Sequence, residues 1–228
     1  MTTAVLLVVG LVTVSWIAIR DHGALRTSRS KLFDECAALL DQSQVRRGGD
    51  DFPSVDGSWR GFRVHANLIP DTMTIRRLPQ LWLSLTRFEA RPGLAEFAVL
   101  VRPSGTEFYS LTSQFDQRLK TPPGFPSEVL VRGSRPEAQQ LLDQAAPLLA
   151  EILSDPKVKE IGVTAKGIRL VWQASEGRRG EHLLLRQSVF DDANVRASDF
   201  TTLLDAMDAI SQAVASPSGV ASPEKMAS

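Results

Sequence analysis

A chain of 228 residues with 26 basic and 26 acidic side chains has no formal net charge at neutral pH. This balance argues against a general nucleic-acid-binding protein, because such proteins usually carry a basic excess. The single cysteine, Cys36, excludes an intramolecular disulfide, and a hydrophobic content of 43% is ordinary for a globular protein.

The N-terminal segment is apolar and uncharged from Thr2 to Ile19. As a helix it would extend about 27 Å at about 1.5 Å per residue, just enough for a hydrocarbon core of about 30 Å. A cleaved signal peptide would need a basic start and a small-residue cleavage site, and the segment has neither. Residues 1–20 are therefore predicted to form an uncleaved, single-pass transmembrane anchor.

The basic residues that follow the anchor indicate its orientation. Arg20, Arg26, Arg29 and Lys31 lie just downstream, and nothing comparable lies upstream. The positive-inside rule then places the rest of the chain in the cytoplasm, with residues 21–30 as a basic juxtamembrane linker. An exported domain that faces the periplasm is the alternative.

Residues 31–215 are predicted to form one globular α+β domain, in which helices pack on one face of an antiparallel sheet. Helix-and-strand order suggests two halves, 31–120 and 127–215, and the Pro- and Ser-rich tail, 216–228, is predicted to be disordered.

In the first half, apolar spacing predicts a helix over 31–45, with Cys36 as a small buried hydrophobe on its apolar stripe. Alternating patterns predict strands over 59–68 and 78–88. Two further strands, 96–102 and 106–111, would form a hairpin around Pro103-Ser104-Gly105. A proline-rich loop over 112–126 and a short strand over 127–132 follow.

In the second half, Ser134 and Glu137 form a capping-box pattern that opens a helix reaching Leu153, with a kink or break at Pro147. Strands are predicted over 158–164, 168–174 and 182–189. Ser198 would cap a last helix from Asp199 to Ala215. Its expected core stripe is Phe200, Leu203, Leu204, Met207 and Ile210.

Known catalytic and ligand-binding signatures fail on inspection. Gly48-Gly49-Asp50-Asp51-Phe52 resembles the GG[DE]EF signature of diguanylate cyclases, but Asp51 replaces a glutamate and the family's upstream elements have no counterpart here. The Asp191–Asn194 region lacks the glycine and glutamate of a calcium loop. His22, His65 and His182 have no zinc-ligand spacing. We therefore expect no catalytic, cofactor-binding or metal-ligating residues, and no cofactor.

Two functions remain open at this stage. The sequence favours a non-catalytic interaction or scaffold module at the cytoplasmic membrane face, with a protein partner and no nucleic acid. Trp59, Trp82 and Trp172 are candidate contacts that could equally be core residues. The alternative is a small-molecule-binding or enzymatic domain with a pocket that includes His65 or His182.

Arginines supply a further candidate surface between residues 60 and 102. They fit either a solvated sheet face or a patch that meets anionic lipid headgroups or an acidic partner. The residues are Arg60, Arg63, Arg76, Arg77, Arg87, Arg91 and Arg102.

Overall fold

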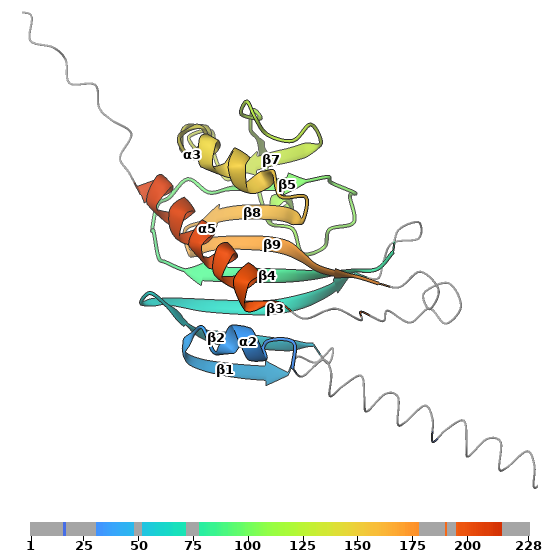
Figure 1. The fold of residues 1–228 in the computed structure, drawn as a ribbon. Helices are drawn as coiled ribbons and strands as arrows, with labels where there is room; N and C mark the ends of the chain where they lie inside the picture. Colours follow the sequence, from blue (N-terminus) through green and yellow to red (C-terminus); the bar gives the residue numbers. More distant parts are fainter. Residues whose placement is uncertain are drawn as a thin grey trace, which may run out of the picture.

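A computed structural model describes residues 16, 31–47, 52–71, 78–177, 190 and 195–215. The described strands form one antiparallel sheet of nine, in the order β1-β2-β3-β4-β9-β8-β5-β7-β6 (Figure 1). Their bounds are β1 Asp41–Arg47, β2 Pro53–Trp59, β3 Phe62–Asp71, β4 Gln80–Phe88, β5 Phe97–Val101, β6 Gln117–Arg118, β7 Val129–Gly133, β8 Val158–Thr164 and β9 Gly167–Glu176.

Two long helices, α3 (Ala138–Leu153) and α5 (Ala197–Ala215), pack against each other and lie over the same face of the sheet (Figure 1). The short α2 (Asp34–Ala37) contacts β1 and α5. We call this side the helix-covered face. The prediction of an α+β fold built on antiparallel sheet is confirmed, and sheet predominates.

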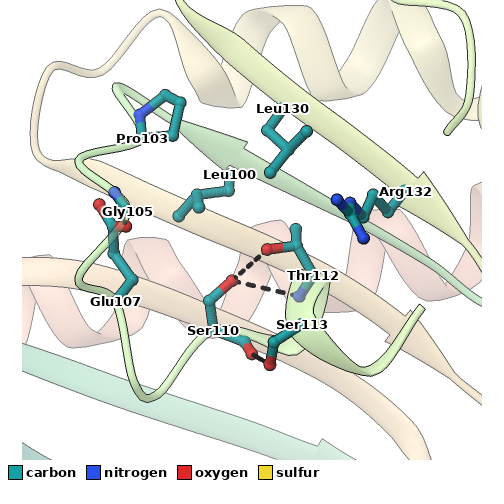
Figure 2. A pocket seen from close by; sticks show the side chains of 9 residues that line it. All are labelled: Leu100, Pro103, Gly105, Glu107, Ser110, Thr112, Ser113, Leu130 and Arg132. Atoms are coloured by element: carbon teal, nitrogen blue, oxygen red, sulfur yellow. Dashed lines mark hydrogen bonds between the residues drawn. The ribbon is translucent and has the colours of Figure 1, made fainter. Parts of the chain in front are cut away.

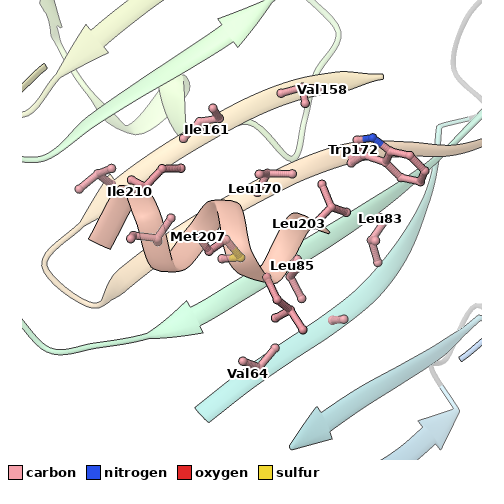
Figure 3. Packing of buried hydrophobic residues seen from close by; sticks show 14 of the residues in the cluster. Val64, Leu83, Leu85, Val158, Ile161, Leu170, Trp172, Leu203, Met207 and Ile210 are labelled. Atoms are coloured by element: carbon pink, nitrogen blue, oxygen red, sulfur yellow. The ribbon is translucent and has the colours of Figure 1, made fainter. Parts of the chain in front are cut away.

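Alternation along β4 explains why this face is covered. Leu81, Leu83 and Leu85 point to the helices and have no exposed surface. Burying a leucine side chain contributes roughly 1.5–3 kcal/mol. The predicted stripe of α5 packs onto these strands and is confirmed as core, as Figure 3 shows for Leu203, Met207 and Ile210.

The helix predicted over 31–45 is wrong in its second part. Only Asp34–Ala37 is α-helical, and Asp41–Arg47 pairs with β2 as the strand β1. Leu32, Phe33 and Cys36 are buried, but residues 41–46 are all exposed and supply no continuing apolar stripe. Hydrogen bonding to β2 therefore decides their conformation, which local periodicity could not reveal.

The strand predicted over 59–68 is in fact parts of two strands. β2 ends at Trp59, β3 begins at Phe62, and these two residues pair. Arg60 and Gly61 form the turn with positive φ angles of 48° and 85°. Such a two-residue turn matches the twist of a hairpin, but Arg-Gly is not among its common sequence signals.

The strand predicted over 106–111 is also wrong, because this segment leaves the sheet. The Glu107 carboxylate accepts hydrogen bonds from the backbone N–H groups of Ser104 and Gly105, at 2.7 and 2.9 Å. These bonds stabilise a turn over residues 104–107. The 3₁₀ helix η1 (Leu111–Gln114) follows this turn. A local side-chain bond has replaced a sheet ladder.

The capping box predicted for α3 does not form. The Ser134 hydroxyl accepts a hydrogen bond from the Glu96 N–H, at 3.0 Å, and α3 begins later without a side-chain cap. The helix continues through Pro147 to Leu153, so no break forms. Pro147 is on the exposed side, where a carbonyl that loses its helical partner can bond water.

The predictions for β4, β5, β7, β8 and β9 are confirmed to within a few residues. The strand predicted over 182–189 and the tail 216–228 lie outside the described residues. So does the predicted anchor, 1–20, apart from Trp16. Among the described helices, none has the length and apolar character needed to cross a membrane.

Candidate functional site

The second face of the sheet is covered differently, by a loop of residues 102–116 that connects β5 to β6. We call this segment the covering loop and this side the loop-covered face. A β-bulge between Val158 and Glu160 breaks the regular register of β8 against β9. Lys159 and Glu160 then both contact the covering loop.

Lys159 fastens the start of the covering loop. Its Nζ donates hydrogen bonds to Glu107 Oε1 and to the Arg102 carbonyl, each at 2.7 Å. The two charged side chains are only 6% and 4% exposed. Burial alone would raise the pKa of Glu107, but hydrogen bonds from Lys159 and Ser104 lower that pKa to about 2. This carboxylate is therefore ionised and fully used in holding the loop.

Glu160 fastens the middle of the loop. Its Oε1 accepts a hydrogen bond from the Leu111 N–H at 3.0 Å. Leu111 also rests on Gly162, where a Cβ atom would lie 2.4 Å from Leu111 Cδ1. A side chain at position 162 would therefore displace the Leu111 side chain from this position on the sheet. Tyr109 packs beside Trp82, with ring centroids 6.2 Å apart.

Three buried polar atoms beneath the loop have no hydrogen-bond partner within the described residues. They are Glu160 Oε2, Tyr109 Oη and Trp82 Nε1. Burial raises the pKa of Glu160 and of Tyr109, and it lowers the pKa of Arg169 nearby. Because Glu160 has no exposed surface, it cannot reach a ligand from solvent in this arrangement and holds the loop instead.

Next to the fastened part of the loop is a pocket of about 220 Å³. Figure 2 shows an apolar wall of Leu100, Pro103 and Leu130 facing a polar wall. The polar lining consists of Glu107, Ser110, Thr112, Ser113 and Arg132. Leu100 and Leu130 are directly paired between β5 and β7, so both side chains project to this face.

Arginines at the edge of the pocket lack acidic partners. Arg132 on β7 is directly paired with Arg118 on β6, which places both side chains on the same face. No described carboxylate forms an ion pair with either. Within the described residues the Arg132 guanidinium donates one hydrogen bond, from Nη1 to the Phe115 carbonyl at 3.1 Å, and its Nε is buried without a partner. Two like charges in direct register favour a bound anion.

The covering loop also exposes an aromatic side chain. Phe108 is 61% exposed, the most of any large hydrophobic residue in the domain as described. Its ring contacts the buried Tyr109 edge-on, with centroids 5.3 Å apart. Glu107, its immediate neighbour, lines the pocket. Phe108 itself does not line the pocket, so the loop presents an exposed apolar side chain on the same face as the pocket and apart from its lining.

The three candidate tryptophans are not surface contacts. Trp82 and Trp172 are buried, and Trp59 is half-buried with its Nε1 donating to Asp208 at 3.2 Å. Trp172 Nε1 donates to Asp155 at 2.9 Å. Each indole is held by the fold, so the core interpretation applies to all three. Cys36 is likewise buried, its Sγ is 3.2 Å from the Val195 carbonyl, and burial raises its pKa to about 12.

The arginines between residues 60 and 102 do not form one patch. Arg60, Arg87 and Arg91 converge on α5 and pair with carboxylates there or with Glu89. Arg63 stacks over the Phe88 ring, and Arg102 donates to backbone carbonyls. Arg76 and Arg77 lie outside the described residues. Arg118 and Arg132, which have no ion-pair partner among the described residues, lie elsewhere, on β6 and β7.

The histidines do not meet in a site. His65 pairs with Asp56 across β2 and β3 at 3.1 Å, and His182 lies outside the described residues. No cluster suited to hold a metal ion occurs in the described part of the chain. Sequence reasoning missed Phe108, Arg118 and Arg132. One available signal was an aromatic residue in a segment rich in Gly, Pro and Ser.

Comparison with known proteins gives no functional assignment. No family model matches the chain, and no curated protein matches it.

Proposed function

We propose that the chain is a membrane-anchored, non-catalytic interaction module that binds a protein partner through its loop-covered face. The binding surface consists of the exposed Phe108 of the covering loop, the pocket, and the basic pair Arg118 and Arg132. The observation that carries the proposal is that an exposed aromatic side chain, the pocket and a basic pair without ion-pair partners in the described residues all lie on the loop-covered face.

Such a combination suits protein recognition. Binding energy at protein interfaces concentrates in aromatic and arginine side chains that become desolvated when the partner binds. Phe108 offers apolar surface that is exposed in the free domain. Arg118 and Arg132 offer donors that no described carboxylate already occupies.

The pocket volume favours a piece of a partner over a whole metabolite. Sites for drug-sized ligands typically measure about 300–1,000 Å³. At about 220 Å³, this pocket fits one or two side chains. An enzymatic function would also need a reachable titratable group. Glu160 is fully buried, and the oxygens of Glu107, the carboxylate of the lining, are already bonded by Lys159, Ser104 and Gly105.

The sequence supports the membrane part of the proposal. The uncharged run from Thr2 to Ile19 would hold the domain at the bilayer, and the following basic residues would keep it on the cytoplasmic side. Alkaline extraction of membranes should leave the full chain in the pellet and release a chain lacking residues 1–30. A reporter that is active only in the cytoplasm should be active when it is fused after Ser228, and a reporter that is active only in the periplasm should be inactive there. Release of the full chain, or activity of a reporter that needs the periplasm, contradicts this part.

The interaction is tested by purification in mild detergent of the full chain, Phe108→Ala, and Glu151→Ala. Glu151 is an exposed residue of α3 on the other face and serves as the matched control. A stoichiometric partner should co-purify with the wild type and the control, and its recovery should fall at least about tenfold for Phe108→Ala. Equal recovery with all three proteins contradicts a role for the loop-covered face.

A further inference from the structure

We propose that the pocket recognises the free C-terminus of the partner chain, taking its carboxylate on Arg132 and Arg118 and its last, aliphatic side chain against Leu100 and Leu130. This proposal rests on the proposed function, because it names the part of the partner that enters the site.

The charge balance of the pocket selects an anion. Glu107 is the one carboxylate in the lining, and Lys159 neutralises it at 2.7 Å. Its oxygens are already occupied by Lys159, Ser104 and Gly105. Arg132, the one basic residue of the lining, and Arg118, which pairs with it across β6 and β7, have no ion-pair partner among the described residues, so this side of the pocket is locally positive.

The donor geometry suits a carboxylate. A guanidinium presents five N–H donors in a planar fork, which matches the two oxygens of a carboxylate. Arg132 uses one bond to hold the Phe115 carbonyl, and its Nε is buried without a partner. The bond from Nη1 to Phe115 fixes the orientation of the guanidinium, and the remaining N–H groups of Nη1 and Nη2 can donate to a ligand. Thr112 lies beside it in the lining, as Figure 2 shows.

The apolar wall of the pocket favours a ligand that carries an aliphatic side chain next to its carboxylate. Leu130 and Arg132 are two residues apart on β7, which is about 7 Å along a strand. A C-terminal residue carries its carboxylate and its side chain on the same Cα atom, so it can reach both at once. A glutamate side chain ends in its carboxylate and has no separate aliphatic group to place against Leu130. The spacing thus favours a chain terminus over an internal acidic residue.

The probe for this inference is a set of three acetylated pentapeptides with one common sequence, Gly-Ser-Gly-Val followed by the last residue. The first ends in leucine with a free carboxylate, the second ends in leucine amide, and the third ends in glutamate amide. Binding to the full chain in detergent micelles is followed by backbone amide chemical shifts. The free-carboxylate peptide should bind in the range of about 0.1–1 mM and shift the amides of the covering loop and β7.

The amide peptide should bind at least about tenfold more weakly, because a charge-assisted pair is lost. Arg132→Gln should abolish this preference, Arg132→Lys should restore part of it, and Arg46→Gln should leave it unchanged. Arg46 is an exposed arginine on the edge strand β1 and is the matched control.

Equal binding of the carboxylate and amide peptides, or stronger binding of the glutamate peptide, overturns the inference. The proposed function would then stand if Phe108→Ala still lost the purified partner. If no peptide shifts the covering loop, the inference is also wrong. If Phe108→Ala additionally retains its partner, the proposed function fails with it.

Discussion

The two faces of the sheet treat buried charge in different ways. On the helix-covered face, Asp208 Oδ1 forms an ion pair with Arg87 Nε at 3.1 Å, and Asp208 Oδ2 accepts hydrogen bonds from Arg60 and Trp59 at 2.9 and 3.2 Å. Glu89 is likewise bonded by Arg91 and Ser211, and by Arg87. Burial alone would raise the pKa of Glu89, but these bonds lower it to about 2.

On the loop-covered face, one oxygen of the fully buried Glu160 has no partner within the described chain, and Arg118 and Arg132 lack acidic partners. The comparison distinguishes charged side chains that hold α5 on the sheet from charged side chains that could contact a ligand. The arginines that join α5 to the sheet each have an acidic ion-pair partner, although Arg87 Nε and Arg91 Nη1 make no hydrogen bond. Arg118 and Arg132 have no such partner among the described residues, and a fold gains nothing by placing two arginines in direct register.

The largest expected effect comes from opening the closed network. Asp208→Ala removes a partner of Arg87, a side chain only 4% exposed, and should lower the free energy of unfolding by about 3 kcal/mol. Asp205→Ala removes only an exposed pair with Arg60 and should cost less than about 1 kcal/mol. Urea denaturation of both variants checks this. Equal losses would show that burial of the network does not set its strength.

A smaller effect should follow when the covering loop is pushed off the sheet. Gly162→Val places side-chain atoms where Leu111 lies and should cost about 2 kcal/mol by overpacking. Adding Leu111→Ala should return part of that loss, because the clashing atoms are removed. A double-mutant cycle measured by urea denaturation gives the coupling. Additive effects would mean that Leu111 does not rest on Gly162.

The fastening of the loop by Glu107 should show in its pH dependence. The folded pKa of Glu107 is about 2 against an ordinary 4.5, so its contribution is present above pH 4.5 and lost as pH falls towards 2. Glu107→Gln should be less stable than the wild type by about 1.5 kcal/mol at pH 7. The difference should shrink between pH 4.5 and 2. A constant difference over this range would contradict the ion pair with Lys159.

The smallest effect on stability is expected at the proposed contact itself. Phe108→Ala removes a side chain that is mostly exposed and should change the free energy of unfolding by no more than about 0.5 kcal/mol. Thermal denaturation of the purified protein measures this. A large loss would indicate that Phe108 supports the loop, and its effect on partner recovery could then not be assigned to binding.

Hydrophobic periodicity predicts well those elements that bury one regular apolar face against the core. β4 alternates leucines with other residues, and α5 carries a continuous apolar stripe, so both are recognised in the sequence. β1 is misassigned because six of its seven residues are polar and the strand gains its conformation only by pairing with β2. The segment 106–111 looks like a strand, but Glu107 bonds to the preceding turn and to Lys159 instead.

The candidate site was not predictable by the same means. Arg118 and Arg132 are 14 positions apart and meet only through the register of β6 with β7. The apolar wall joins Leu100 and Leu130 in the same way. Long-range pairing of this kind leaves no motif in one sequence. What the sequence did indicate, an interaction module without catalytic signatures, is the role for which this surface is proposed.

The most direct test of the account is site-specific photo-crosslinking of the full chain in native membranes. A photoreactive residue is placed in turn at position 108, at position 45 on the edge strand, and at position 151 on α3. All three side chains are exposed, so the probe is equally reachable. The account predicts one defined adduct from position 108, reduced by Arg132→Gln, and none from the other two. An adduct from position 45 or 151 but not from 108 would place the binding surface elsewhere and contradict the account.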